Sequence, residues 1–221
     1  PARARATPCL ARWLKRADRS NAMPATSKGD QAKRHRLGLA AAQGNAQSQC
    51  ALGLMLHRGE GGPKDLAEAR RLLGLAAAQG HPGGQYNLGH VHHAGQGGPV
   101  DLVEARRLYG LAVAQGHADA QGALGLMHHQ GQGGPVDLAE ARRLYGLAAA
   151  QGHAEAQRAL GCMHHDGEGG PVDFAEARQL FGLAAAQGHA IAQYNLGYMH
   201  HHGQGGPVNF AEARRLYGLA A

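Results

Sequence analysis

Residues 124–153 read LGLMHHQGQGGPVDLAEARRLYGLAAAQGH, and near copies of this stretch recur through most of the chain. Aligned on the Leu-Gly pair, the copies follow one another every 36 residues. The glycines of this pair are Gly53, Gly89, Gly125, Gly161 and Gly197. A fixed period of this length is the signature of a repeat protein, in which each copy is one supersecondary unit.

Each copy carries the pattern of two helices. In LAEARRLYGLAAAQGH the apolar residues return every three or four positions, which is the period of a helix. An Asp or Asn stands three residues before a Glu at its start, as in a capping box, and a Gln-Gly pair marks its end. The capping residues are Asp65, Asp101, Asp137, Asp173 and Asn209. A further helix, at 82–94 and 118–130 in two copies, fills the rest of the unit.

These patterns predict an all-α fold, a right-handed alpha/alpha superhelix (solenoid) of 36-residue helix-turn-helix repeats, because neither helix can bury its apolar stripe alone. We expect the solenoid to occupy residues 30–221 as about five repeats, the first and last incomplete, after a basic, disordered leader at 1–29. Glycines also recur inside the second helix, where each costs about 1 kcal/mol relative to Ala. This recurrence predicts close approach of backbones at Gly74, Gly110, Gly146 and Gly182.

Charge is unevenly distributed along the 221 residues. Residues 1–36 hold ten Lys and Arg against two acidic residues, whereas the rest holds twelve basic and fourteen acidic residues. We therefore expect no nucleic-acid partner for the repeats. No apolar run approaches the roughly 20 residues that cross a bilayer, so we expect no membrane segment. The cytoplasm is the favoured compartment, with organelle targeting by the basic arm as the alternative.

The consensus ALGxMHHxGxGGPVDxAEARRLYGLAAAQGHAxAQ resembles the Sel-1-like repeat family, a relative of the tetratricopeptide repeat, over about residues 37–221. The resemblance implies an alpha/alpha superhelix that serves as an adaptor or scaffold in protein assembly, without catalysis of its own in most members. One difference concerns the third residue after the Leu-Gly pair, which is usually Tyr in the family. Here this residue is His92, His128, His164 or His200.

The glycine-rich turn and its histidines suggest two chemistries, phosphate binding and metal binding. A phosphate on the GxGG turn would meet the carboxylates of Asp137 and Glu140 in the first helical turn, which disfavours binding. Adjacent histidines diverge by about 100° on a helix, so His-His is a poor chelate. Only His90 and His93 have useful spacing. We therefore expect no metal site and no cofactor, and keep a histidine-rich metal-binding protein as the alternative function.

The recurring histidines have a structural interpretation. His92 follows Leu88 by four residues, and its counterpart in the first unit is Leu56, so this position is predicted to be buried. A buried neutral imidazole needs a hydrogen-bond partner, and its pKa is depressed. A second set is expected to act as polar groups at helix starts, namely His81, His117, His153 and His189.

The copies differ mainly at four positions of the first helix, spaced i, i+3, i+7 and i+11, which trace one face. The first helix commonly lines the concave surface of such solenoids, so this face is a candidate partner groove, with drift of an exposed face as the alternative. Tyr86, Tyr194 and Tyr198 are the expected anchors. The full set of predicted partner-binding residues is Tyr86, His90, Asp119, Glu155, Arg158, Ile191, Tyr194 and Tyr198.

No Ser, Cys or carboxylate nucleophile recurs beside a base, so we expect no enzyme and no catalytic residue. The function predicted is a non-enzymatic scaffold or adaptor that binds a protein or peptide partner along the variable face. The chain stops at RRLYGLAA, before the Gln-Gly pair that ends this helix elsewhere. An end without a polar cap predicts self-association there.

Overall fold

The structure of the chain is a computed structural model that describes residues 27–221, and these residues form eleven helices and no strands. The helices are α1 Lys28–Ala42, α2 Ala46–Arg58, α3 Leu66–Ala78, α4 Pro82–Ala94, α5 Leu102–Val113, α6 Ala118–Gln130, α7 Leu138–Ala150, α8 Ala154–Asp166, α9 Phe174–Ala186, α10 Ala190–His202 and α11 Phe210–Ala220. The all-α repeat fold is confirmed. Apart from its last three residues, the predicted leader lies outside the described residues.

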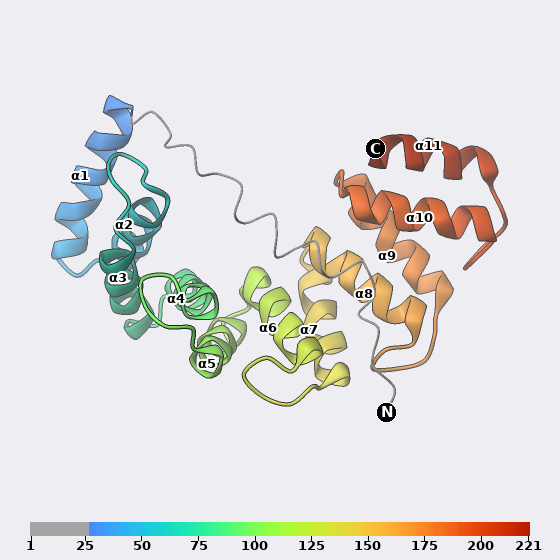
Figure 1. Ribbon diagram of the computed structural model, residues 1–221, viewed down its shortest axis with the longest axis horizontal. Helices are drawn as coiled ribbons and strands as arrows, with labels where there is room; N and C mark the ends of the chain where they lie inside the picture. The colour runs from blue at the N-terminus through green and yellow to red at the C-terminus, as the bar shows by residue number, and fades with distance from the viewer. Residues whose placement is uncertain (1–26) are drawn as a thin grey trace.

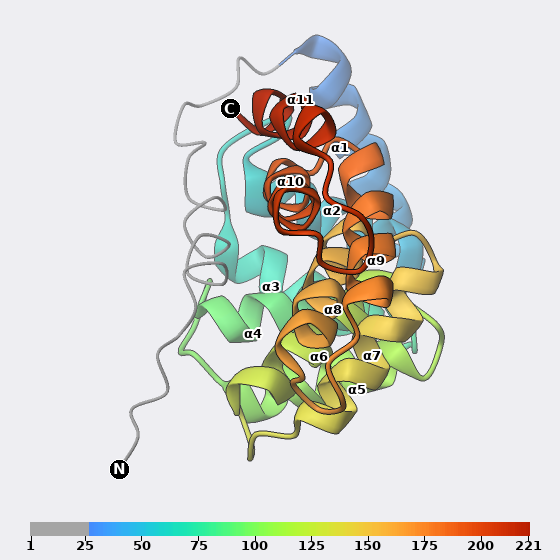
Figure 2. The same cartoon turned by 90° about the vertical axis from the view of Figure 1, so that its right-hand side faces the viewer.

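The helices stack in chain order into an open arc, with α1 at one end and α11 at the other (Figure 1). Extensive contacts join helices that follow one another in sequence, and α2 also contacts α4. Figure 2, turned by 90°, shows the pairs from α2/α3 to α10/α11 succeeding one another along the superhelix. The core therefore runs from unit to unit, as expected for a solenoid.

Each second helix begins at the predicted cap. The Asp137 carboxylate accepts a hydrogen bond from the Glu140 amide at 2.9 Å. Glu140 in turn forms an ion pair with Arg143 at 2.7 Å. The same amide-to-cap bond is made at Asp65, Asp101, Asp173 and Asn209. Negative charge thus lies at the positive end of every second-helix dipole.

Histidine caps the first helix of four units. The Nδ1 of His153 accepts a hydrogen bond from the Ala156 amide at 3.1 Å. His81, His117 and His189 cap α4, α6 and α10 in the same way. The expectation that these histidines act at helix starts is confirmed, and each ring then carries its neutral-state proton on Nε2.

The GxGG turn packs on the preceding unit. Gly133 has a φ of 66°, and a Cβ there would collide with the carbonyl oxygen of Leu102, at the start of the previous second helix. Gly97, Gly169 and Gly205 repeat this arrangement. Glycine is needed on both grounds, because it accepts positive φ and leaves room for the neighbouring backbone.

The two helices of a unit approach each other closely at the glycine of the Leu-Gly pair. A Cβ on Gly161 would lie 2.8 Å from a ring carbon of Phe181, and a Cβ on Gly125 would lie 3.0 Å from the Tyr145 ring. Gly89, Gly53 and Gly197 meet a side chain of the next helix in the same way. The missing side chain therefore lets the second helix seat a large buried residue against the first.

The prediction of close backbone approach at Gly74, Gly110, Gly146 and Gly182 is wrong. A Cβ on any of them would find nothing within 4 Å. The tight contact is made by the first helix, at the Leu-Gly glycine, and not by the second. The structure offers no packing reason for these four glycines.

Hydrogen bonds between units recur with the sequence period. His129 Nε2 lies 2.7 Å from the Glu168 carboxylate in the next turn, and His165 Nε2 lies 3.1 Å from the Gln204 amide oxygen. His57 and His93 make the equivalent contacts with Gln96 and Gln132. Four histidines at equivalent positions thus tie their units to the next, namely His57, His93, His129 and His165.

Two Gly-to-Ala substitutions should act in opposite directions. Gly161→Ala in α8 pushes a methyl group into the Phe181 ring, so we expect a loss of about 1–3 kcal/mol in unfolding free energy. Gly182→Ala in α9 meets no neighbour, so it should gain about 0.5–1 kcal/mol from helix propensity. Urea unfolding followed by circular dichroism measures both. Equal effects at the two sites would contradict this account of the packing.

Candidate functional site

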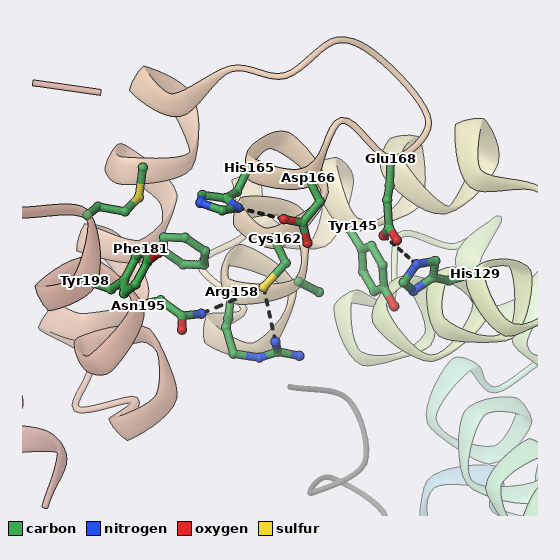
Figure 3. A pocket seen from close by; sticks show the side chains of 12 residues that line it. His129, Tyr145, Arg158, Cys162, His165, Asp166, Glu168, Phe181, Asn195 and Tyr198 are labelled. Carbon is green, nitrogen blue, oxygen red and sulfur yellow. Dashed lines mark hydrogen bonds and ion pairs between the residues drawn. The ribbon is translucent and has the colours of Figure 1, made fainter. Parts of the chain in front are cut away.

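The variable positions of the first helices line two adjoining cavities. The smaller, of about 110 Å³, involves Tyr86 of α4, Asp119 and Gly122 of α6, and Glu155 of α8. The larger, of about 160 Å³, is lined mainly by α8 and α10 and is seen from close by in Figure 3. The residues common to both linings are Tyr145, Arg158 and Ala159.

In the larger cavity most polar side chains are bonded to one another. His165 Nδ1 lies 2.7 Å from the Asp166 carboxylate. The Cys162 thiol accepts from Arg158 at 3.6 Å and from Asn195 at 3.8 Å. Figure 3 shows Arg158, Cys162 and Asn195 close together, with the His129–Glu168 pair beyond Tyr145. This wall is therefore polar and internally connected.

Arg158, which lines both cavities, belongs to an ionic cluster. Arg158 is buried, with 3% of its surface exposed, and its Nε donates to Glu155 at 2.9 Å. His189, the cap of α10, lies 2.7 Å from the other carboxylate oxygen. Burial alone would raise the pKa of Glu155, but the hydrogen bonds from His189 and Arg158 outweigh it and lower this pKa to about 2. Glu155 is thus ionised, and Arg158 is held as part of the wall.

The smaller cavity opens where a side chain is missing. Gly122 stands at the position that carries Cys50, Tyr86, Arg158 and Tyr194 in the other units. Within the described part of the chain, a Cβ there would meet only His153, at 3.6 Å. The Tyr86 ring stacks on His117 with centroids 5.0 Å apart and forms one wall.

Asp119 lies at the exposed part of this cavity. More than half of its side chain, 54%, is exposed, and one carboxylate oxygen lies 3.3 Å from His153. Burial raises the pKa of both Tyr86 and Tyr145, so their phenols remain neutral. The cavity therefore combines aromatic walls with a carboxylate at its edge.

The predicted partner-binding residues divide into two groups. Tyr86, Asp119, Glu155 and Arg158 meet around the smaller cavity, and Arg158 and Tyr198 line the larger. The others line neither cavity, namely His90, Ile191 and Tyr194.

The two tyrosines of α10 are exposed. Tyr194 is 55% exposed and packs against Tyr217, with centroids 5.4 Å apart. Tyr198 is 40% exposed and stacks on His202 at 4.0 Å. His90, by contrast, is half-buried, and its pKa is lowered by burial and by the neighbouring His57 and His93.

Tyr145 is a site residue that the sequence pattern did not identify. It comes from the second helix, α7, is almost fully buried, and still reaches both cavities. Its position carries Tyr, Phe or Leu in the other units. The only signal in the sequence was a hydroxyl on an otherwise apolar position, which is too general to identify a groove residue.

The histidines after the Leu-Gly pair are half-buried and not fully buried as predicted. His128 Nδ1 lies 2.9 Å from Arg106 Nη2 of the preceding second helix. Burial lowers the pKa of His128, and the positive charge of Arg106 lowers it further. His92, His164 and His200 have the same arginine partner and the same direction of shift. The predicted polar partner is therefore found, and the lowered pKa agrees with the prediction of a neutral imidazole.

In the described part of the chain, no three His, Cys, Asp or Glu side chains gather closely enough to hold a metal ion. The amides at the second-helix starts are occupied by the Asp or Asn caps. Between residues 27 and 221 there is also no helix that is long and apolar enough to span a membrane. No observation here favours the metal-binding alternative.

A stack of two-helix units with variable residues along one face defines the class of alpha-solenoid repeat proteins. The profile of the Sel1 repeat matches residues 46–81, 82–117, 118–153, 154–189 and 190–221. This chain belongs to the Sel1 repeat family. Proteins of this family are generally non-catalytic scaffolds that bind protein partners.

Solved structures agree with this assignment. A protective antigen of uropathogenic Escherichia coli strains, which displays an SLR fold, is similar with 34% identity and a TM-score of 0.81. The match covers 85% of this chain and 40% of the antigen, so this chain spans less than half of that protein's length. A Sel1 repeat protein from Oxalobacter formigenes has 29% identity and a TM-score of 0.78, over 86% and 76% of the two chains.

More distant likeness concerns the fold alone. An immunity protein from Pseudomonas aeruginosa has 17% identity and a TM-score of 0.52, over 90% of this chain and 83% of that protein. Among curated proteins, the sequence comparison found no match.

Stability should fall as His128 and its three counterparts become protonated. Their folded pKa values lie below the ordinary value near 6.5, so the stability that they contribute is present above pH 6.5 and lost as pH falls through it. We expect the melting temperature to drop between pH 7.5 and 5, and to drop less in His128→Leu, which copies Leu56 of the first unit. An identical pH dependence in the variant would contradict this role.

Proposed function

We propose that this protein is a non-enzymatic scaffold that binds a peptide or an extended protein segment along the face formed by α4, α6, α8 and α10. One observation carries the proposal. Both cavities are lined at positions where the units differ, as at Asp119, Gly122, Arg158 and Cys162. The residues that stay the same make the caps, the turns and the core.

Exposure alone does not make a position vary in this chain. The second helices also carry an exposed position, which is Leu in every unit and is 40% exposed at Leu111, 41% at Leu147 and 47% at Leu183. This exposed position has not varied, whereas the first-helix face has. Variation concentrated on one face supports a recognition surface.

The hydrogen bonds of the larger cavity support binding over catalysis. His129 is bonded to Glu168, and His165 is bonded to both Asp166 and Gln204. A general base has to face the proton that it removes. These imidazoles instead join one unit to the next or to a neighbour on the same helix, which favours a structural role.

A display library of random peptides provides ligands for a direct test. Units stacked about 10 Å apart and an extended peptide rising about 3.3 Å per residue imply that about twelve residues span the groove. Peptides selected on the wild-type protein should lose at least tenfold in affinity for Tyr194→Ala/Tyr198→Ala, because exposed aromatic anchors dominate such interfaces. Fluorescence anisotropy with labelled peptides measures the affinities.

The matched control is Leu147→Ala/Leu183→Ala, which removes two exposed apolar side chains from the second helices. We expect this variant to bind the selected peptides as the wild type does. Peptides that lose affinity for the leucine variant alone would place recognition on the second-helix face, against this proposal.

A further inference from the structure

The smaller cavity has the size and position of a side-chain pocket. Gly122 removes the side chain that every other unit places at this point of the first helix. The resulting cavity measures about 110 Å³. An apolar cavity of about 150 Å³ in another protein admits a benzene molecule, so there is room here for one extended side chain.

The pocket walls suit a cation that carries an apolar stem. Tyr86 and Tyr145 supply aromatic rings, and Ala123 and Leu126 supply aliphatic surface. Neutral phenol rings attract ammonium and guanidinium groups, and the attraction grows as water is excluded. The methylene stem of Lys or Arg would pack on the aliphatic part of the same wall.

Charge around the two cavities favours the same occupant. Among residues 27–221, which the structure describes, four carboxylates line them, and Arg158 is the only Lys or Arg in either lining. Arg158 is already paired with Glu155. The remaining carboxylates are Asp119, Asp166 and Glu168, which have only histidine partners among their ion pairs. A basic partner segment is therefore attracted to the groove, and an acidic one is repelled.

We propose that the pocket at Gly122 binds a lysine or arginine side chain of the partner segment, with Asp119 accepting its charge and Tyr86 and Tyr145 enclosing its stem. This inference rests on the proposed function, because it names the partner chemistry of the same groove. The adjoining larger cavity receives a second side chain of the segment. At about 10 Å between units, the two anchors are about three residues apart in an extended peptide.

Gly122→Tyr tests the pocket directly. It fills the cavity with the side chain that the equivalent position carries at Tyr86 and Tyr194, so the repeat tolerates it. The matched control is Gly146→Tyr on α7, which adds the same side chain where a Cβ meets nothing and which lines neither cavity. Asp119→Asn is a second variant, because it removes the charge without changing the size. Melting curves verify that each variant is folded.

The probes are the peptides selected on the wild-type protein and sensitive to Tyr194→Ala/Tyr198→Ala. We expect them to be enriched in Lys or Arg at one position, and replacement of that residue by Met to weaken binding at least tenfold. Gly122→Tyr should weaken binding by the same factor, Asp119→Asn by severalfold, and Gly146→Tyr should leave it unchanged. In Gly122→Tyr the peptide's Lys-to-Met change should have no further effect, since coupled partners are not additive.

Two results separate the failure of this inference from that of the proposed function. Groove peptides that bind Gly122→Tyr as tightly as the wild type, or that are enriched in acidic residues, overturn the basic-side-chain pocket and leave the scaffold function standing. Selection that yields no peptide dependent on Tyr194 and Tyr198 overturns both. If Gly122→Tyr proves unstable, unchanged affinity in Asp119→Asn is the result that overturns the pocket.

Discussion

The contact between the Leu-Gly glycine and the large side chain of the next helix is the constraint on which the other features depend. At Gly125 a single Cβ would meet the Tyr145 ring at 3.0 Å, so the distance between the two helices of the unit is set by the absence of a side chain. The ring that fills this space passes through the core and reaches both cavities of the groove. The interaction that packs the unit therefore also builds the wall of its candidate binding site. A scaffold of this kind cannot change the wall at Tyr145 without changing the packing of the repeat.

Polar contacts carry this geometry from one unit to the next. Each bonds residues a fixed number of positions apart, as Arg106 does with His128 and His129 does with Glu168. The arginine-to-histidine distance is 3.3 Å at Arg70 and between 2.7 and 2.9 Å in the three later units. Arg70 Nη1 is also buried without a hydrogen-bond partner among residues 27–221. Of the four arginine-to-histidine contacts, the one between Arg70 and His92 is therefore the least well hydrogen-bonded. It contributes the least to stability, because a buried donor without a partner destabilises the folded state.

Local chemistry explains what could be predicted from the sequence. The helices expected at 82–94 and 118–130 are found at Pro82–Ala94 and Ala118–Gln130, because caps and glycine stops act within a few residues of where they stand. Features that depend on packing between units were not accessible. The arginine partner of His128 is 22 positions away, and the His189 that bonds Glu155 beside the buried Arg158 lies 34 positions from Glu155. Sequence periodicity likewise identified recurring glycines but not which of them meets a neighbour, since this depends on the face that each helix turns toward the next.

The position shared by Cys50, Tyr86, Gly122, Arg158 and Tyr194 shows how a uniform scaffold can acquire selectivity. The backbone around these five residues repeats, so at this position the units differ only in the volume and charge of the side chain. Tyr194 adds an exposed ring, and Gly122 leaves a cavity between its neighbours. Arg158 is buried and forms an ion pair with Glu155. A missing side chain in one unit can therefore contribute to selectivity as much as an added side chain in another. A partner must fill the space that the missing side chain leaves and must avoid the volume that the added side chain occupies. Recognition along such a groove depends on the order of these side chains and not on any single residue.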